Sequence, residues 1–267
     1  MRKGVLSNIL RSLRLLYLFD RAHYIFQKIK YRKTNRAFRL RHPDIALPPD
    51  YMMYESFQLN YKKYFSESHK SAQWLVELIS KYKLFNDIKV LDWGCGPGRI
   101  VRHLPELAGQ RCEFFATDYN PGTINWCKNN LPGIHFNVNT LEAGLPYRDG
   151  FFDIIYGLSV FTHLSEKKHY QWYDELKRIL KRGGILLITT QGANFSNKLM
   201  ENESKDFNNG DLVVRGKVKE GHRTFSAFHP KEFMYRLFEN SQVLCHIERP
   251  LEKGKGIPQD VWIVRKQ

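Results

Sequence analysis

A glycine-rich turn between residues 92 and 99 is the part of the sequence whose residue types and spacing best suit chemistry. The apolar run 88–93 leads directly into Gly94-Cys95-Gly96-Pro97-Gly98-Arg99. Glycines at this spacing let a ligand approach the backbone where a Cβ atom would block it. Ligands in open α/β sheets bind at the ends of strands. The turn therefore predicts a small-molecule site.

Asp118 lies twenty residues beyond Gly98, at the end of the next apolar run. A carboxylate there can accept hydrogen bonds from the hydroxyls of a ribose. A dinucleotide-binding loop would need glycine at position 99, which is Arg99, and a phosphate-binding P-loop would need Gly-Lys-Ser/Thr, which is absent. The remaining spacing, GxGxG behind Asp92, suits a cofactor with a ribose and an amino-acid tail but no phosphates.

The elements that must position these residues alternate between short apolar runs and helical patterns, which is typical of an α/β domain with a mostly parallel sheet. The pattern predicts strands over 88–93, 112–118, 134–138, 152–158, 184–190, 242–249 and 260–266. It predicts helices over 67–82, 98–108, 121–130, 165–181 and 230–240, with Ser165 as an N-cap and Gly183-Gly184 as a stop. Residues 191–229 fit no regular element and are interpreted as a lid-like insertion, with a hairpin pairing 211–214 with 217–219.

The first 41 residues differ from the rest in charge. They hold twelve of the 42 Lys and Arg residues and one acid, Asp20, in a chain whose net charge is +15. Apolar residues at helical spacing alternate with these cations, so the segment 1–42 is expected to form one or two basic amphipathic helices. Residues 43–65, rich in proline at their start, are expected to be a linker that covers the cofactor pocket, and residues 66–267 the catalytic domain.

Cysteine content and hydropathy bear on metal binding, on the redox setting and on membrane-spanning segments. Its four cysteines are scattered, with no pair at zinc-ligand spacing, so we expect no metal site and a reducing, cytoplasmic setting. No apolar run approaches the length that spans a bilayer, and the first residues do not resemble a cleavable signal peptide.

Four motifs in order resemble class I S-adenosylmethionine-dependent methyltransferases. They are Leu91 to Arg99, Asp118 within Ala116-Thr117-Asp118-Tyr119-Asn120, the segment Leu145-Pro146-Tyr147 with Phe151 to Ile155, and Leu176 to Gly184 running into Ile185-Leu186-Leu187-Ile188. The resemblance covers roughly residues 70–190, with Arg182 in place of a usual proline. It implies a Rossmann-like seven-stranded, mostly parallel sheet with helices on both faces, behind the basic N-terminal extension.

The resemblance also implies a site. S-adenosylmethionine would be held by Asp92, Gly94, Gly96, Gly98, Asp118, Asn139, Leu141 and Ser159, with Asn139, Thr140 and Leu141 as the candidates for contact with adenine. His163, after the fourth strand, is either a helix-start residue or the general base of the reaction. His222 and His229 flank the insertion and are interpreted as ordinary polar residues.

A second resemblance, to a subgroup of this family, indicates the class of methyl acceptor. Residues 155–164, Trp126-Cys127 and residues 259–264 are similar to a bacterial subgroup that accompanies glycosyltransferases in surface-polysaccharide pathways, which implies a sugar hydroxyl of a glycan or a related small acceptor. Two alternatives stay open: methylation of RNA or a ribosomal component, and a non-catalytic cofactor-binding partner subunit. Residues 1–41 would bind an anionic membrane surface at the inner membrane face, a partner protein or, less favoured, nucleic acid.

Overall fold

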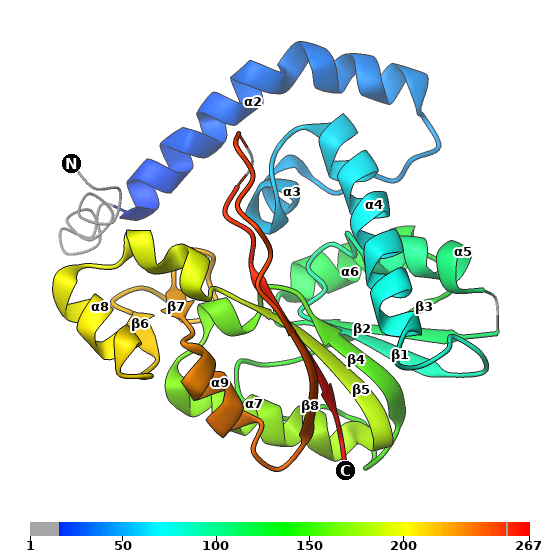
Figure 1. Cartoon of the computed structure of the whole chain (residues 1–267). Helices are drawn as coiled ribbons and strands as arrows, with labels where there is room; N and C mark the ends of the chain where they lie inside the picture. The colour runs from blue at the N-terminus through cyan, green and yellow to red at the C-terminus, as the bar shows by residue number, and fades with distance from the viewer. Residues whose placement is uncertain (1–15, 110, 255) are drawn as a thin grey trace. The chain divides into compact units, whose positions relative to one another are not determined.

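The computed structural model describes residues 16–109, 111–254 and 256–267, which form two compact units, Tyr17–Asn139 and Thr140–Gln267 (Figure 1). The strand order is β3-β2-β1 in the first unit and β4-β5-β9-β8 in the second, and together these are the seven strands that the sequence predicts. Of the helices in these residues, none is long and apolar enough to cross a membrane.

The first unit places three parallel strands behind a helical N-terminal part. Its strands pair in register, with Leu91 opposite Phe115 and Phe115 opposite His135. All but the first residue of β1 are buried, as in a strand covered on both faces. The elements are α2 (Leu16–Arg41), α3 (Asp50–Ser56), α4 (Tyr61–Ser80), β1 (Lys89–Trp93), η1 (Val101–His103), α5 (Leu104–Ala108), β2 (Glu113–Asp118), α6 (Pro121–Asn130) and β3 (Ile134–Val138).

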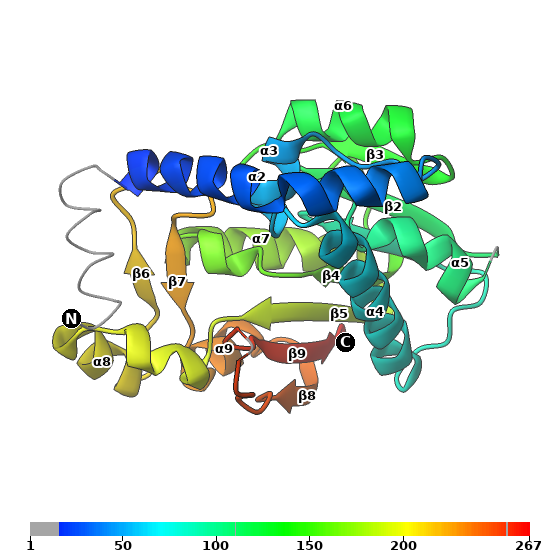
Figure 2. The same cartoon turned by 90° about the horizontal axis from the view of Figure 1, so that it is seen from above.

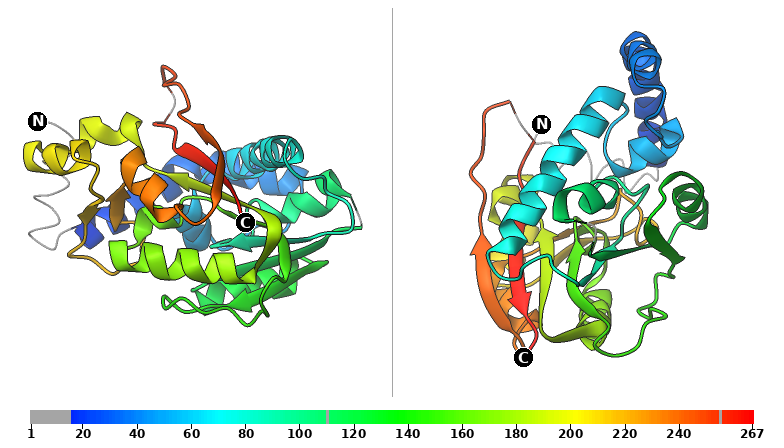
Figure 3. Two further views of the ribbon diagram at one scale, coloured as in Figure 1. Left: turned by 60° about the horizontal axis from the view of Figure 1, so that its bottom comes forward. Right: turned by 90° about the vertical axis from the view of Figure 1, so that its right-hand side faces the viewer.

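The second unit combines parallel and antiparallel pairing. Strand β4 runs parallel to β5, while β9 pairs antiparallel with both β5 and β8, and β6 and β7 form a separate two-stranded sheet (Figures 2 and 3). The elements are β4 (Phe152–Gly157), η2 (Phe161–His163), α7 (Glu166–Ile179), β5 (Leu180–Thr190), η3 (Ala193–Lys198), α8 (Glu201–Asn208), β6 (Val213–Arg215), β7 (Ser226–Phe228), α9 (Lys231–Leu237), β8 (Gln242–Ile247) and β9 (Asp260–Arg265).

The first unit differs from the predicted elements in three places. The expected helix over 98–108 is a series of turns, then η1, then the short α5. Pro105 in the first turn of α5 explains the late start, because it cannot donate the backbone bond that would continue a helix from residue 101. The expected linker contains α3 and the start of α4. Helix α4 begins at Tyr61 rather than Glu67, since Asn60 caps it by accepting from the Lys63 N–H at 2.9 Å.

The second unit also differs from the predicted elements in three places. Strand β6 pairs with β7 and not with 217–219. Helix α7 ends at Ile179 and passes directly into β5 at Leu180, before the predicted glycine stop, because Leu180 is already extended and pairs with Phe152. Ser165 occupies the N-cap position but makes no side-chain cap; its N–H donates instead to Glu220 Oε1 at 2.5 Å. Residues 1–15 of the predicted basic helix lie outside the described residues.

Candidate functional site

The glycine turn at the end of β1 adopts the conformation that its sequence predicts. Gly94, Gly96 and Gly98 have φ angles of 74°, 52° and 67°, in the left-handed region that side chains with a Cβ disfavour. The N–H groups of Gly94 and Cys95 donate to the Thr117 carbonyl at 2.8 and 2.9 Å, which fastens the turn to β2. The turn is therefore fixed to β2 by backbone hydrogen bonds, and three of its positions carry no side chain.

Asp118 connects this turn to the next helix. Its Oδ2 accepts from the Gly96 N–H and its Oδ1 from the Asn120 N–H, both at 2.9 Å. Burial raises the pKa of Asp118, and backbone hydrogen bonds from Asn120, Gly96 and Tyr119 oppose that shift. An ionised carboxylate has about four lone-pair positions, so these bonds leave it capacity to accept from a ligand.

The remaining first-unit residues of the predicted site lie beside Asp118. Asp92 is buried in β1 and, after burial itself, is the largest cause of the raised pKa of the Cys95 thiol. The Asn139 N–H, just past β3, donates to the Asp118 carbonyl at 3.1 Å. The structure thus brings together the carboxyl ends of three parallel strands, the usual place for a ligand in such a sheet.

Helix α3, within the segment 43–65 that is expected to cover the pocket, supplies neighbours that the sequence did not single out by residue. A methyl group at Gly96 would lie 3.5 Å from Ser56 Cβ, and one at Gly122 would lie 3.9 Å from Met52 Cε. Burial raises the pKa of the Tyr119 phenol, the charge of Asp118 raises it further, and Glu55 is close enough to add a smaller effect in the same direction. Residues 52–56 therefore border the glycine turn and the start of α6. They carry no motif, so the helical spacing of α3 would have been the sole signal.

In the second unit, Ser159 has a strained backbone and a full set of polar contacts. Its φ is 66°, its N–H donates to Thr189 Oγ1 at 2.8 Å, and its Oγ accepts from Gln259 Nε2 at 2.8 Å. Non-glycine residues in this conformation are concentrated at functional sites. Leu141 accepts at its carbonyl from Trp172 Nε1 at 3.1 Å.

His163 has the tautomer that a base requires. Its Nδ1 donates to the Phe225 carbonyl at 2.8 Å, which leaves Nε2 as the unprotonated nitrogen. Burial lowers the pKa of His163, and the nearby His222 and Arg223 lower it further. The insertion 191–229 packs on this element, because the Gly221 N–H donates to the His163 carbonyl at 2.9 Å. The ring is therefore neutral and fixed at neutral pH.

The two other histidines of the insertion have separate surroundings. His229 is fully buried, and its Nε2 lies 2.9 Å from Nε2 of the buried His169. His222 interacts through Nδ1 with the Thr224 hydroxyl at 2.8 Å. Among the described residues, His246, Glu248 and Asp260 form one group with metal-ligand chemistry, but His246 Nε2 and Asp260 Oδ2 already lie 3.0 Å apart as hydrogen-bond partners.

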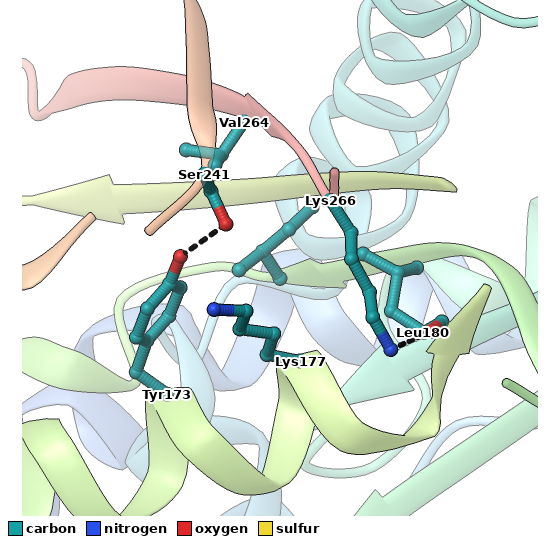
Figure 4. A pocket seen from close by; sticks show the side chains of 7 residues that line it. Tyr173, Lys177, Leu180, Ser241, Val264 and Lys266 are labelled. Carbon is teal, nitrogen blue, oxygen red and sulfur yellow. Dashed lines mark hydrogen bonds between the residues drawn. The ribbon is translucent and has the colours of Figure 1, made fainter. Parts of the chain in front are cut away.

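A small pocket in the second unit lies at the other end of the strands. It is bordered by Tyr173, Lys177, Leu180, Leu186, Ser241, Val264 and Lys266 (Figure 4). Its polar groups bind one another: the Tyr173 hydroxyl donates to Ser241 Oγ at 2.6 Å, and Lys266 Nζ donates to the Leu180 carbonyl at 2.7 Å. Ligands of open α/β sheets bind at the carboxyl ends of parallel strands, whereas this pocket lies where β5 begins.

Comparison with known proteins finds a family model that matches part of the chain. Residues 90–184 match the model of a methyltransferase domain family. The chain is 31% identical over 105 residues to a tRNA (carboxymethyluridine(34)-5-O)-methyltransferase of Arabidopsis thaliana, covering 39% of this chain and 24% of the relative. It is 29% identical over 121 residues to a ubiquinone/menaquinone biosynthesis C-methyltransferase of Bordetella avium, covering 43% and 45%. The chain thus spans less than half of these curated relatives.

Solved structures show the same fold. A SAM-dependent methyltransferase of Methanosarcina mazei superimposes with a TM-score of 0.55 at 20% identity, covering 71% of this chain and 96% of that one. A protein of Pyrococcus horikoshii gives 0.56 at 17% identity, covering 76% and 92%. The predicted fold is confirmed. Residues 90–184 match the methyltransferase domain that the sequence predicts, and S-adenosylmethionine is the methyl donor of that family.

Proposed function

We propose that the chain, with its class I methyltransferase domain, transfers a methyl group from S-adenosylmethionine to an oxygen atom. The acceptor is a sugar hydroxyl of a glycan or a related small molecule. The observation that carries the proposal is the glycine turn with Asp118 fastened to it. The setting is the cytoplasm, at the inner face of the membrane.

The residues of the first unit fit the methyl donor. The bare backbone at Gly94 and Gly96 admits a ligand, while Gly98 packs against Leu131, and Asp118 retains capacity to accept from ribose hydroxyls. Asn139, and Leu141 and Ser159 of the second unit, remain predicted contacts. When bound, the donor supplies a methyl group already activated by a sulfonium, so the protein's task is to orient the acceptor and remove its proton.

His163 is the residue suited to that proton transfer. Nε2 takes the proton of the acceptor hydroxyl as the oxygen bonds to the methyl carbon, and the Phe225 carbonyl holds the ring through Nδ1. Because burial lowers the pKa of His163, the imidazolium formed in the reaction readily releases its proton to solvent. A neutral base fixed in orientation suits the removal of a proton from a hydroxyl acceptor.

The acceptor class rests on sequence. The segment Gly157-Leu158-Ser159-Val160 lacks the Asn/Asp-Pro-Pro-Tyr/Phe signature common among enzymes that methylate RNA-base amines. RNA is still the second candidate, because one relative is by name a tRNA methyltransferase and residues 1–41 carry twelve Lys and Arg. A partner subunit that binds the donor without turnover is the third.

Calorimetry tests the site first. Asp118→Asn keeps the shape of the side chain but removes its charge, so it should weaken binding of S-adenosylmethionine and S-adenosylhomocysteine by roughly tenfold or more. Glu113→Gln, an exposed carboxylate at the other end of the same strand, is the matched control and should bind as the unaltered protein does. Binding by Asp118→Asn within twofold of the unaltered protein would contradict the assigned site.

A turnover assay then tests acceptor and base. Labelled methyl transfer is measured to bacterial surface glycans and their lipid-linked precursors, and in parallel to total RNA. His163→Asn, whose amide can still donate to the Phe225 carbonyl, should lower kcat on the glycan by about 100-fold or more with donor affinity unchanged. Transfer to RNA alone would overturn the glycan acceptor, and donor binding with no transfer to either would favour the partner-subunit alternative.

A further inference from the structure

Helix α2 is anchored along one side by hydrogen bonds within the first unit. Asn35 donates through Nδ2 to the Leu59 carbonyl at 2.9 Å and accepts from the Tyr61 N–H at 3.0 Å. Gln27 Oε1 accepts from the Leu59 N–H at 3.0 Å, and Asp20 Oδ1 accepts from the Tyr54 hydroxyl at 2.8 Å. Side chains at positions 20, 27 and 35 therefore fix which side of α2 faces its own unit.

The opposite side of α2 exposes large apolar side chains. Leu18, Ile25, Phe26 and Ile29 are 65%, 50%, 60% and 71% exposed. Their spacing of seven, eight and eleven residues places them on one face of a helix with 3.6 residues per turn. Contiguous exposed apolar side chains of this size mark an interaction surface rather than ordinary solvent-facing residues.

Basic side chains border this apolar face on both edges. At 100° per residue, Arg21, Lys28 and Arg32 lie along one edge and Lys30 along the other, while Lys33 lies in line with the apolar face, one turn beyond Ile29; all five residues are exposed. The ammonium group of Lys30 lies over the ring of Phe26, 5.9 Å from its centre. Over its 26 residues the helix has eight Lys and Arg and one acid. Long basic side chains can extend past an apolar face while their charged ends stay in water.

We infer that this face of α2 binds the surface of an anionic bilayer. The helix lies in the plane of the headgroups, the apolar residues at positions 18, 25, 26 and 29 enter the boundary with the acyl chains, and the flanking cations meet lipid phosphates. Nucleic acid offers the same phosphates, but its bases stack on aromatic rings, and three of the four large side chains in this face are aliphatic. The inference stands apart from the proposed acceptor, although a membrane surface suits one that is lipid-linked.

Co-sedimentation of the full chain with vesicles tests the inference. The chain should bind vesicles of phosphatidylcholine with 30% phosphatidylglycerol and bind pure phosphatidylcholine much less, and raising NaCl from 0.05 to 0.5 M should weaken the binding. The variant Ile25→Ser/Phe26→Ser/Ile29→Ser should lose at least tenfold in partitioning. Leu84→Ser/Leu251→Ser, which removes exposed apolar side chains elsewhere, is the matched control and should bind as before.

The cations are tested by Lys30→Glu/Lys33→Glu, which should lose a similar factor on anionic vesicles. Circular dichroism and S-adenosylmethionine binding, measured on every variant, should be unchanged, so failure of this inference is separate from failure of the proposed function. Equal binding to neutral and anionic vesicles, or to neither, would overturn it. Full vesicle binding by the triple serine variant would also overturn it. The same holds if the chain binds RNA but no vesicles, and only Lys30→Glu/Lys33→Glu loses the RNA binding.

Discussion

Gly98 and Gly133 share a left-handed backbone but differ in what surrounds them. Their φ angles are 67° and 77°. A methyl group at Gly98 would lie 2.5 Å from Leu131 Cδ1, whereas one at Gly133 would have no heavy atom within 4 Å. Gly98 is therefore needed both for its backbone conformation and for close packing against Leu131 at the end of α6. Gly133 is needed for its backbone conformation alone.

This difference predicts unequal costs for the same substitution. Gly133→Ala should lower the free energy of unfolding by about 1 kcal/mol, the cost of a left-handed alanine. Gly98→Ala should cost about 1–3 kcal/mol more, because the buried Leu131 must move. Urea denaturation of both variants measures the two values. Equal losses would show that Leu131 yields without cost and would contradict the packing argument.

At the residue scale, the sequence could predict the groups that belong to a motif. The three glycines, Asp92 and Asp118 follow from spacing along one strand-turn-strand segment, and the structure brings them together. Ser56 and Glu55 could not be found, because their relation to the glycine turn depends on how α3 packs and no local pattern encodes it. The tautomer of His163 likewise depends on Phe225, 62 residues away.

Among the elements, the insertion 191–229 is stabilised by a buried ion pair between α8 and β6. Arg215 donates to both carboxylate oxygens of Glu203, at 2.8 and 2.5 Å, and to the Lys198 carbonyl at 2.6 Å. The two side chains are 6% and 11% exposed. The insertion is thus an ordered substructure in which one charge pair connects a helix to a short strand.

Glu203→Gln should therefore destabilise this element strongly. It leaves a buried guanidinium without its counter-charge, which costs roughly 3 kcal/mol or more. Hydrogen exchange should become faster throughout residues 198–215. Glu201→Gln, at an exposed pair with Lys205 on the same helix, is the control and should change exchange little. Equal protection in the two variants would mean that the ion pair does not hold the insertion in place.

Elements were predictable where hydrophobic period and caps agree. Residues 121–130 and 134–138 match α6 and β3, since Asn120 caps the helix and Pro121 starts it. The hairpin partner of β6 was missed, because two three-residue strands separated by ten residues leave no periodic signal. The glycine stop after α7 was misplaced, because Gly183 and Gly184 lie inside β5.

For the whole molecule, buried neutral histidines determine part of the stability. Burial lowers the pKa of His103 and of His169 to about 4, and it also lowers that of His229 well below the ordinary value. An unfolded histidine titrates near 6.5, so between pH 6.5 and 4 the unfolded chain binds more protons than the folded one. The stabilisation is therefore complete above pH 6.5 and is lost as the pH falls toward 4.

Unfolding free energies measured in urea from pH 7.5 to 5 should fall by up to about 1.4 kcal/mol per pH unit for each such histidine. His169→Gln should reduce that slope by roughly one histidine's share, with the exposed His23→Gln as control. A slope identical in the unaltered protein and in His169→Gln would show that His169 is not held neutral by the fold.

The position of β9 has a consequence for how the chain is made. In the second unit, β9 lies between β5 and β8 and pairs with both, although it is translated after them. While the ribosome is still upstream of residue 260, β8 has no neighbour and β5 has a bare edge. The strands of the first unit, by contrast, pair with one another as soon as residue 138 has emerged. During synthesis, the segment that contains the glycine turn and Asp118 can therefore fold before the second unit is complete. The second unit keeps unpaired strand edges until β9 has been made.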